Sequence, residues 1–234
     1  MNLPSNHKSG FTIIELMLAM GFISLLMLAI AMLTIHISTI YNQGITLREV
    51  NQAGITVSED LQRTISSTSP FIVNEADESS RYIKKPGGGR LCAGNHSYVW
   101  NYLGEGEDTP PAPLNKYTGG NSTPISLAKV IDPDHSLCQD LTENINQTDA
   151  SELLFSGDRN LVLYDFSVRS PNVTASSSQA LYSVNFTLGT SGTDIVDATN
   201  KICKPPSESD QSREYCAINK FSIIVRAGSE AGGR

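Results

Sequence analysis

An uncharged apolar run near the start of the chain is the feature that most constrains its fold. The 20 residues from Leu16 to Ile35 carry no formal charge, and no Lys or Arg occurs between Lys8 and Arg48. As a helix the run is about 30 Å long, enough to cross the hydrocarbon core of a bilayer. One acidic residue, Glu15, precedes it directly. Burying a carboxylate in hydrocarbon costs roughly 2.5–3.5 kcal/mol, so we expect Glu15 to have a partner.

The flanking charges predict an orientation. The positive flank is the N-terminal one, which places the short leader in the cytoplasm and the bulk of the chain on the other side of the membrane. A secretory signal peptide would have a shorter apolar region followed by a small-residue cleavage site, and none follows Ile35. A plain signal anchor would explain the length of the run, but not Glu15 or the Gly10–Phe11 junction.

Residues Gly10 to Leu16 read Gly-Phe-Thr-Ile-Ile-Glu-Leu. This stretch resembles the class III signal of type IV pilins and type II secretion pseudopilins, and the resemblance covers roughly the first 40 residues. It implies a prepilin-type N-terminal cleavage and methylation domain. A prepilin peptidase of the inner membrane would cut between Gly10 and Phe11 and then methylate the new amine of Phe11.

The same residues suggest a physical role for Glu15. The cut would leave a cationic amine on Phe11, about one helical turn before the carboxylate. In a low-dielectric bundle an unpaired Glu15 is unfavourable, whereas a Glu15 paired with the amine of a neighbouring subunit is tolerated. We therefore expect Glu15 to select one axial stagger between subunits during assembly.

After the apolar run the pattern continues as an amphipathic helix, which Ser66–Pro70 should end. The expected segments are a cleaved leader (1–10), an apolar membrane or filament-core helix (11–37) and an amphipathic helix (38–68). The apolar face predicted for the second half comprises Ile40, Leu47, Val50, Gly54, Val57, Leu61 and Ile65.

The rest of the chain predicts an α+β fold in which the long helix packs on an antiparallel β-sheet, with a long irregular insert. Residues 70–151 are rich in Gly, Pro, Asn and Ser, and only His96–Leu103 and Pro124–Ile131 resemble short strands. Residues 152–228 predict the sheet, and residues 229–234 a tail. Its expected strands alternate in hydrophobicity and span Leu161–Val168, Leu181–Leu188 and Lys220–Arg226. The pilin resemblance implies the same helix-on-sheet architecture.

Four cysteines lie beyond the apolar run, an even number that favours two disulfides on an exported chain. Of the three possible connectivities we prefer Cys203–Cys216 with Cys92–Cys138, because the first pair closes a short polar loop. Four reduced cysteines remain the alternative.

No catalytic or cofactor-binding constellation is evident, so the sequence predicts a non-enzyme that is itself a substrate of the peptidase. The glycines at 87–89 lack the spacing of a phosphate-binding loop, and we expect an ordinary loop there. Asp132-Pro133-Asp134 could offer oxygens to Ca²⁺ but lacks the full ligand spacing, so no metal site is predicted. The net charge of -7 argues against nucleic acid as the main partner.

The resemblance therefore implies a minor pilin that initiates or caps pilus assembly together with other minor and major pilins. Removing ten residues leaves about 224 of 234, which exceeds the length of a typical major pilin. Large minor pilins of the PilW kind and pseudopilins of the GspJ kind are similar in size and layout. The implied location is the bacterial inner membrane, in a single pass with the globular part periplasmic, and then the pilus or pseudopilus. The alternatives are a type II secretion pseudopilin, and a pilus-tip adhesin or DNA-binding module on a pilin anchor.

Overall fold

The computed structural model describes most of the chain in ten stretches. These are residues 12–74, 80–102, 112–118, 124–142, 145–154, 161–170, 178–191, 195–197, 200–204 and 216–228. The chain divides into two units, Met1–Asn42 and Gln43–Arg234, and each is treated by itself below.

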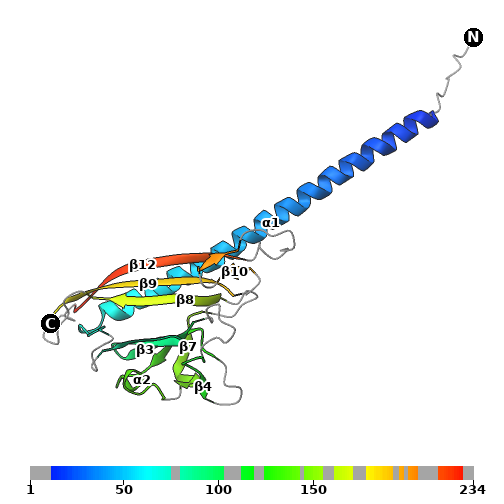
Figure 1. Ribbon diagram of the computed structural model, residues 1–234. Helices are drawn as coiled ribbons and strands as arrows, with labels where there is room; N and C mark the ends of the chain where they lie inside the picture. Colours follow the sequence, from blue (N-terminus) through cyan, green and yellow to red (C-terminus); the bar gives the residue numbers. More distant parts are fainter. Residues whose placement is uncertain are drawn as a thin grey trace, which may run out of the picture. The chain divides into compact units, whose positions relative to one another are not determined.

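Helix α1 runs from Ile13 to Ser66 and contributes to both units (Figure 1). Its last turn tightens, since the Thr68 N–H donates to the Ile65 carbonyl three residues earlier. Pro70 follows shortly afterwards. The helix predicted over residues 11–68 is therefore confirmed over 13–66, and it ends at the predicted Ser/Thr-rich segment.

In the second unit, strands from the last third of the chain form a three-stranded antiparallel sheet in the order β12-β9-β8 (Figure 1). Its strands are β8 (Leu161–Arg169), β9 (Ala180–Thr190) and β12 (Ile218–Ala227). Each contains one of the strands expected from alternating hydrophobicity. The register places Phe166 opposite Phe186, and Phe186 opposite Phe221.

A second antiparallel sheet, in the order β1-β2-β3-β5-β7, confirms the two short strands expected within residues 70–151, as β3 and β5, and corrects the expectation that the rest of this region is irregular. Its strands are β1 (Tyr82–Lys85), β2 (Gly88–Ala93), β3 (His96–Asn101), β5 (Leu127–Ile131) and β7 (Ala150–Glu152). The expected loop at 87–89 instead turns into β2. A side chain at Gly89 would place its Cβ 2.3 Å from the Trp100 ring, so glycine lets the indole lie over the strand.

The remaining elements are short. They are β4 (Tyr117–Thr118), α2 (Ser136–Gln139), β6 (Ile145–Asn146), a 3₁₀ turn (Gln147–Asp149), β10 (Val196–Asp197) and β11 (Ile202–Cys203). Strands β4 and β6 pair in parallel, and β10 and β11 form an antiparallel pair.

The core of the second unit lies where α1 packs on the sheets, as expected for an α+β fold. Buried α1 residues Val50, Val57, Leu61 and Ile65 share one cluster with residues of both sheets. Aromatic rings continue this cluster across the strands, with centroids 4.3 Å apart for Trp100 and Phe166 and 5.2 Å apart for Phe186 and Phe221. Two residues of the predicted apolar face, Ile40 and Leu47, are instead exposed.

Candidate functional site

The first turn of α1 is closed by reciprocal hydrogen bonds between Thr12 and Glu15. The Thr12 backbone N–H and hydroxyl both donate to Glu15 Oε2, at 3.0 and 2.9 Å. In return the Glu15 N–H donates to Thr12 Oγ1 at 3.3 Å. This is the capping-box arrangement, in which a Thr N-cap and a Glu three residues later satisfy each other's free backbone donors. The Thr-x-x-Glu spacing of residues 12–15 is the sequence signature of this cap, and it is a signal that the expectations for Glu15 missed.

The predicted cleavage and methylation positions, Gly10 and Phe11, lie outside the described residues. The described structure begins at Thr12, directly after them, and α1 begins at Ile13. The predicted cut therefore falls within two residues of the helix start.

The first part of α1 is long and apolar enough to cross a membrane, and none of its most apolar 18-residue stretch is buried. Its large apolar side chains, from Ile13 to Ile37, are all about half exposed or more. Within the part of the chain that the structure describes, nothing covers these side chains, and a lipid bilayer or neighbouring helices would supply the apolar environment that suits them.

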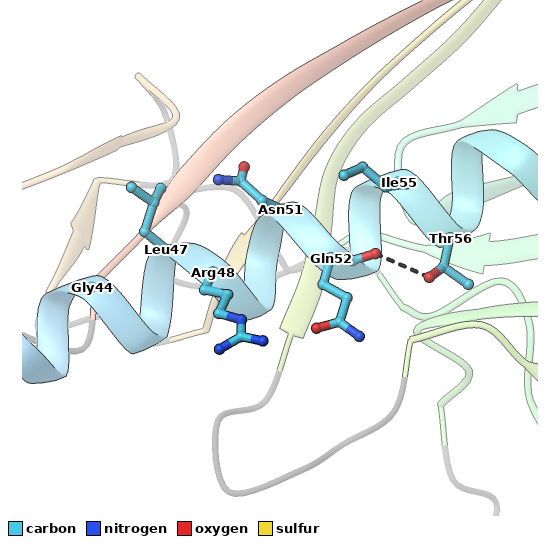
Figure 2. Close-up of a pocket in the computed structure, with 7 residues that line it drawn as sticks. All are labelled: Gly44, Leu47, Arg48, Asn51, Gln52, Ile55 and Thr56. Carbon is cyan, nitrogen blue, oxygen red and sulfur yellow. Dashed lines mark hydrogen bonds between the residues drawn. The ribbon is translucent and has the colours of Figure 1, made fainter.

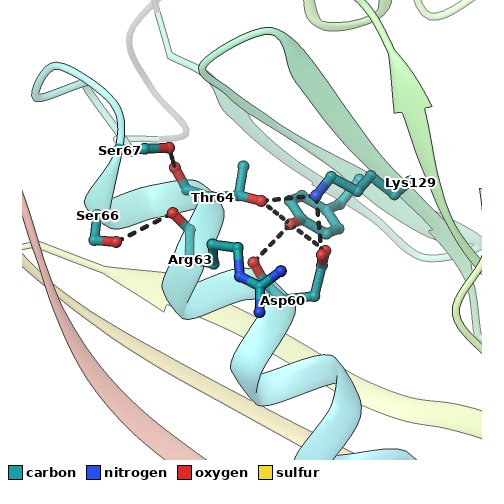
Figure 3. Close-up of polar contacts among 7 residues, drawn as sticks. Asp60, Arg63, Thr64, Ser66, Ser67 and Lys129 are labelled. Atoms are coloured by element: carbon teal, nitrogen blue, oxygen red, sulfur yellow. Dashed lines mark hydrogen bonds and ion pairs between the residues drawn. The ribbon is translucent and has the colours of Figure 1, made fainter.

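In the second unit, a polar cluster joins the end of α1 to the five-stranded sheet (Figure 3). Lys129 Nζ on β5 lies 3.0 Å from Asp60 Oδ1 and 2.9 Å from Thr64 Oγ1. The Tyr98 hydroxyl on β3 bonds the same two side chains, each at 2.7 Å. Burial raises the pKa of Tyr98 well above its ordinary value, so this hydroxyl keeps its proton. The cluster holds the helix on the sheet, and we assign it a structural role.

A shallow hollow of about 440 Å³ lies along α1 on the side that the core does not use (Figure 2). The described residues around it include Leu47, Arg48, Asn51 and Ile55. Leu47 and Ile55 are 48% and 54% exposed. Asn51 Oδ1 accepts a hydrogen bond from Asn219 Nδ2 of β12 at 2.7 Å, which places the hollow beside that strand.

Both disulfides preferred from the sequence are present. Cys92 of β2 is bonded to Cys138 of α2, and Cys203 of β11 to Cys216 just before β12. The first bond fixes α2 to the five-stranded sheet, and the second ties the β10–β11 pair to the start of β12.

A buried arginine beneath α2 was missed at the sequence level. Arg90 is 1% exposed, and its guanidinium donates to Asn115 Oδ1 and to the carbonyls of Leu137, Asp140 and Leu141. Carbonyls at a helix end carry partial negative charge and suit a buried cation. Nothing in the local sequence pattern distinguishes Arg90 from a surface arginine.

The described residues give no support for a metal centre, since they hold no group of three His, Cys, Asp or Glu side chains placed to bind an ion. Asp132, the first residue of the possible calcium motif, accepts hydrogen bonds from Ser97 Oγ at 2.6 Å and from the Ser136 and Leu137 N–H groups. Its carboxylate therefore orders the start of α2.

Comparisons of this chain with known protein families, with curated proteins and with solved structures found no match.

Proposed function

We propose that this chain is a prepilin-like protein that acts as a minor pilin of a type IV pilus system. One observation supports this most strongly. Helix α1 begins at Ile13, two residues after Phe11, and Glu15 lies in its first turn. None of its most apolar 18-residue stretch is buried. An ordinary membrane anchor needs only the apolar length. Assembly of packed helices as proposed also needs a free, positively charged N-terminus and a negative charge that pairs with it.

The capping box is compatible with that role. A cut before Phe11 keeps the Phe11–Thr12 peptide bond, so the Thr12 N–H and its bond to Glu15 can persist in the mature chain. Among the described contacts, the two hydrogen bonds that Glu15 accepts use Oε2 and neither uses Oε1. In the proposed assembly, Oε1 accepts from the methylated amine of a neighbouring subunit while Oε2 caps its own helix.

The globular unit supports a minor rather than a repeating subunit. It includes a five-stranded and a three-stranded sheet and the disulfides Cys92–Cys138 and Cys203–Cys216, and the mature chain would hold about 224 of the 234 residues. In this proposal the protein is anchored in the bacterial inner membrane with the globular unit in the periplasm, and it joins other minor pilins in the complex from which the major pilin polymerises.

Deletion of the gene, with complementation by the intact gene, tests the priming role. We expect few or no surface filaments in the deletion strain and normal numbers after complementation. Unchanged filament number would refute priming. Normal filaments with loss of exoprotein secretion would assign the chain to a type II secretion system.

A further inference from the structure

Strand β12 forms an open edge of its sheet. All ten of its residues, from Ile218 to Ala227, pair with β9 on one side. Within the part of the chain that the structure describes, no strand pairs with the other side. Long edge strands leave a row of backbone donors and acceptors that can bind another strand, and proteins commonly block them with Pro or a bulge. Strand β12 has neither over these ten residues, but it carries Lys220 and Arg226, and charged side chains also protect an edge against most strands.

The hydrogen bonds at the ends of β12 show which backbone groups face outward. The Thr190 N–H of β9 donates to the Ala217 carbonyl at 3.0 Å, so residue 217 points toward β9. The Gly228 N–H instead donates away from β9, to the Thr68 carbonyl. Because hydrogen-bonding direction alternates along an antiparallel strand, the even-numbered residues Ser222, Ile224 and Arg226 direct their N–H and C=O groups to the open edge. The N–H of Lys220, also even-numbered, donates to Asn219 Oδ1 at 2.8 Å.

The face of the sheet that packs on α1 continues past this edge. Gly54 of α1 lies against the Phe221 ring, where an added Cβ would approach the ring to 2.0 Å. Next to Gly54 on the helix surface, a row of residues spaced four apart, Leu47, Asn51 and Ile55, borders the hollow beside β12 (Figure 2). A strand added at the usual spacing of about 4.8 Å would direct every second side chain toward Leu47 and Ile55. Those side chains should be apolar.

The opposite face of β12 is basic. Lys220, Ile224 and Arg226 are exposed there, and the register places Arg169 of β8 in the same cross-strand row as Ile224. Asp165 of β8 lies in the row of Lys220, but its carboxylate is already paired with Lys84 at 3.0 Å. Opposite charges on neighbouring strands are favourable and like charges are not. The side chains of an added strand that lie on the same face as Lys220 and Arg226 should therefore include carboxylates. A second copy of β12 fits less well, because β12 contains Lys220 and Arg226 but no carboxylate to place opposite them.

We propose that the open edge of β12 binds an extended segment of another protein subunit, with alternating apolar and acidic side chains, as a fourth strand. Such strand addition derives its affinity from backbone hydrogen bonds and its specificity from alternate side chains. This inference rests on β12 and α1 alone and does not depend on the processing of the N-terminus.

A labelled peptide and the full-length chain in detergent test the proposal. The probe is the ten-residue peptide Val-Glu-Val-Thr-Val-Thr-Val-Glu-Val-Thr, whose two Glu residues are six positions apart like Lys220 and Arg226, and its control has Lys in place of Glu. Ser222→Pro removes an outward N–H and places a ring at the edge, which a solvent-facing edge position tolerates. Ser222→Ala is the matched variant that keeps the N–H. Fluorescence anisotropy should show saturable binding of the acidic probe to wild type and Ser222→Ala, and about tenfold weaker binding to Ser222→Pro.

A double charge reversal gives a readout that does not depend on proline. Lys220→Glu combined with Arg226→Glu should reverse the preference, so that the lysine peptide binds more tightly than the acidic one. Absence of saturable binding to wild type, or equal binding by a folded Ser222→Pro chain, would overturn the proposal. Wild-type dimers that Ser222→Pro dissociates would assign the edge to a second copy and overturn the choice of partner.

Discussion

Glu15 Oε2 accepts hydrogen bonds from both the backbone N–H and the hydroxyl of Thr12, at 3.0 and 2.9 Å. The carboxylate therefore has a partner within its own chain, at the point where α1 begins. This gives Glu15 two separable properties, a hydrogen-bonding role in the helix cap and a negative charge available to a neighbour. Substitutions can distinguish them, because glutamine serves at this position of a capping box and carries no charge.

Glu15→Gln should lower incorporation of the protein into the pilus complex about as much as Glu15→Ala. In the proposed assembly the Glu15 carboxylate pairs with the amine of Phe11 in a neighbouring subunit, and both substitutions remove that negative charge. Co-purification with other pilins from membranes measures incorporation. Membrane insertion and the fold of the globular unit should be unchanged in both variants, since Glu15 lies outside that unit.

Thr12→Ser is the matched control, because serine also closes a capping box. It should assemble normally. Normal assembly of Glu15→Gln with failure of Glu15→Ala would show that the cap matters and the charge does not, which contradicts the pairing account.

Gly54→Ala should destabilise the globular unit by about 1–3 kcal/mol, because the new methyl group meets the Phe221 ring in a packed region. Gly44→Ala is the matched control on the same helix. Its Cβ has no neighbour within 4 Å, so it should be neutral or stabilising by up to ~1 kcal/mol. Denaturant unfolding of the full-length chain measures both. Equal stability of the two variants would mean that α1 does not pack on β12 as described.

The stability of the globular unit should fall as the pH rises above about 10. Burial raises the pKa of Tyr98, Tyr164 and Tyr182, so the folded chain holds protons that the unfolded chain releases. A raised pKa stabilises the fold below the unfolded pKa, and that stability is lost with further increase in pH, by up to about 1.4 kcal/mol per pH unit for each tyrosine.

Tyr98→Phe should weaken this dependence. The variant should be less stable by about 1 kcal/mol at neutral pH, because Asp60 and Thr64 each lose a hydrogen-bond partner, and its stability should fall less steeply above pH 10. Urea unfolding at pH 7, 9 and 11 gives both numbers. A variant with the same pH slope as wild type would show that Tyr98 does not contribute to it.

Removing the Cys92–Cys138 disulfide should cost more stability than removing Cys203–Cys216. The bonds join residues 46 and 13 positions apart, and the chain-entropy model gives about 4 and about 3 kcal/mol for loops of these lengths. Paired Cys→Ala variants, unfolded in urea, provide the comparison. A larger loss from Cys203–Cys216 would indicate that its loop makes further contacts with the fold.

Much of this fold could be predicted from the sequence because its signals are local. The helix over 13–66 follows from one apolar run and one amphipathic pattern, and β8, β9 and β12 follow from alternation. The five-stranded sheet could not be predicted in the same way. Strand β2 contains Gly88 and Gly89, which are poor strand formers, and the Trp100 ring occupies the space that a side chain at Gly89 would need.

The candidate functional site could also be predicted in part, where its signals are local in the sequence. Glu15 is conspicuous because it is acidic beside an apolar run, and the four cysteines allow few pairings. Leu47 was placed in the core because it fits the helical stripe, yet it is 48% exposed. A periodic pattern shows that a residue can face a partner, but it does not show whether this chain supplies that partner. The polar cluster around Lys129 and the buried Arg90 depend on contacts between distant segments, which periodicity does not report.

The mass of the mature N-terminal peptide shows whether this chain is processed as a prepilin. The protein should be purified from membranes of its own host and analysed by mass spectrometry after proteolysis. Prepilin processing predicts that residues 1–10 are absent and that the chain begins with an N-methylated Phe11. A retained Met1, or a cut beyond Ile35, would contradict it.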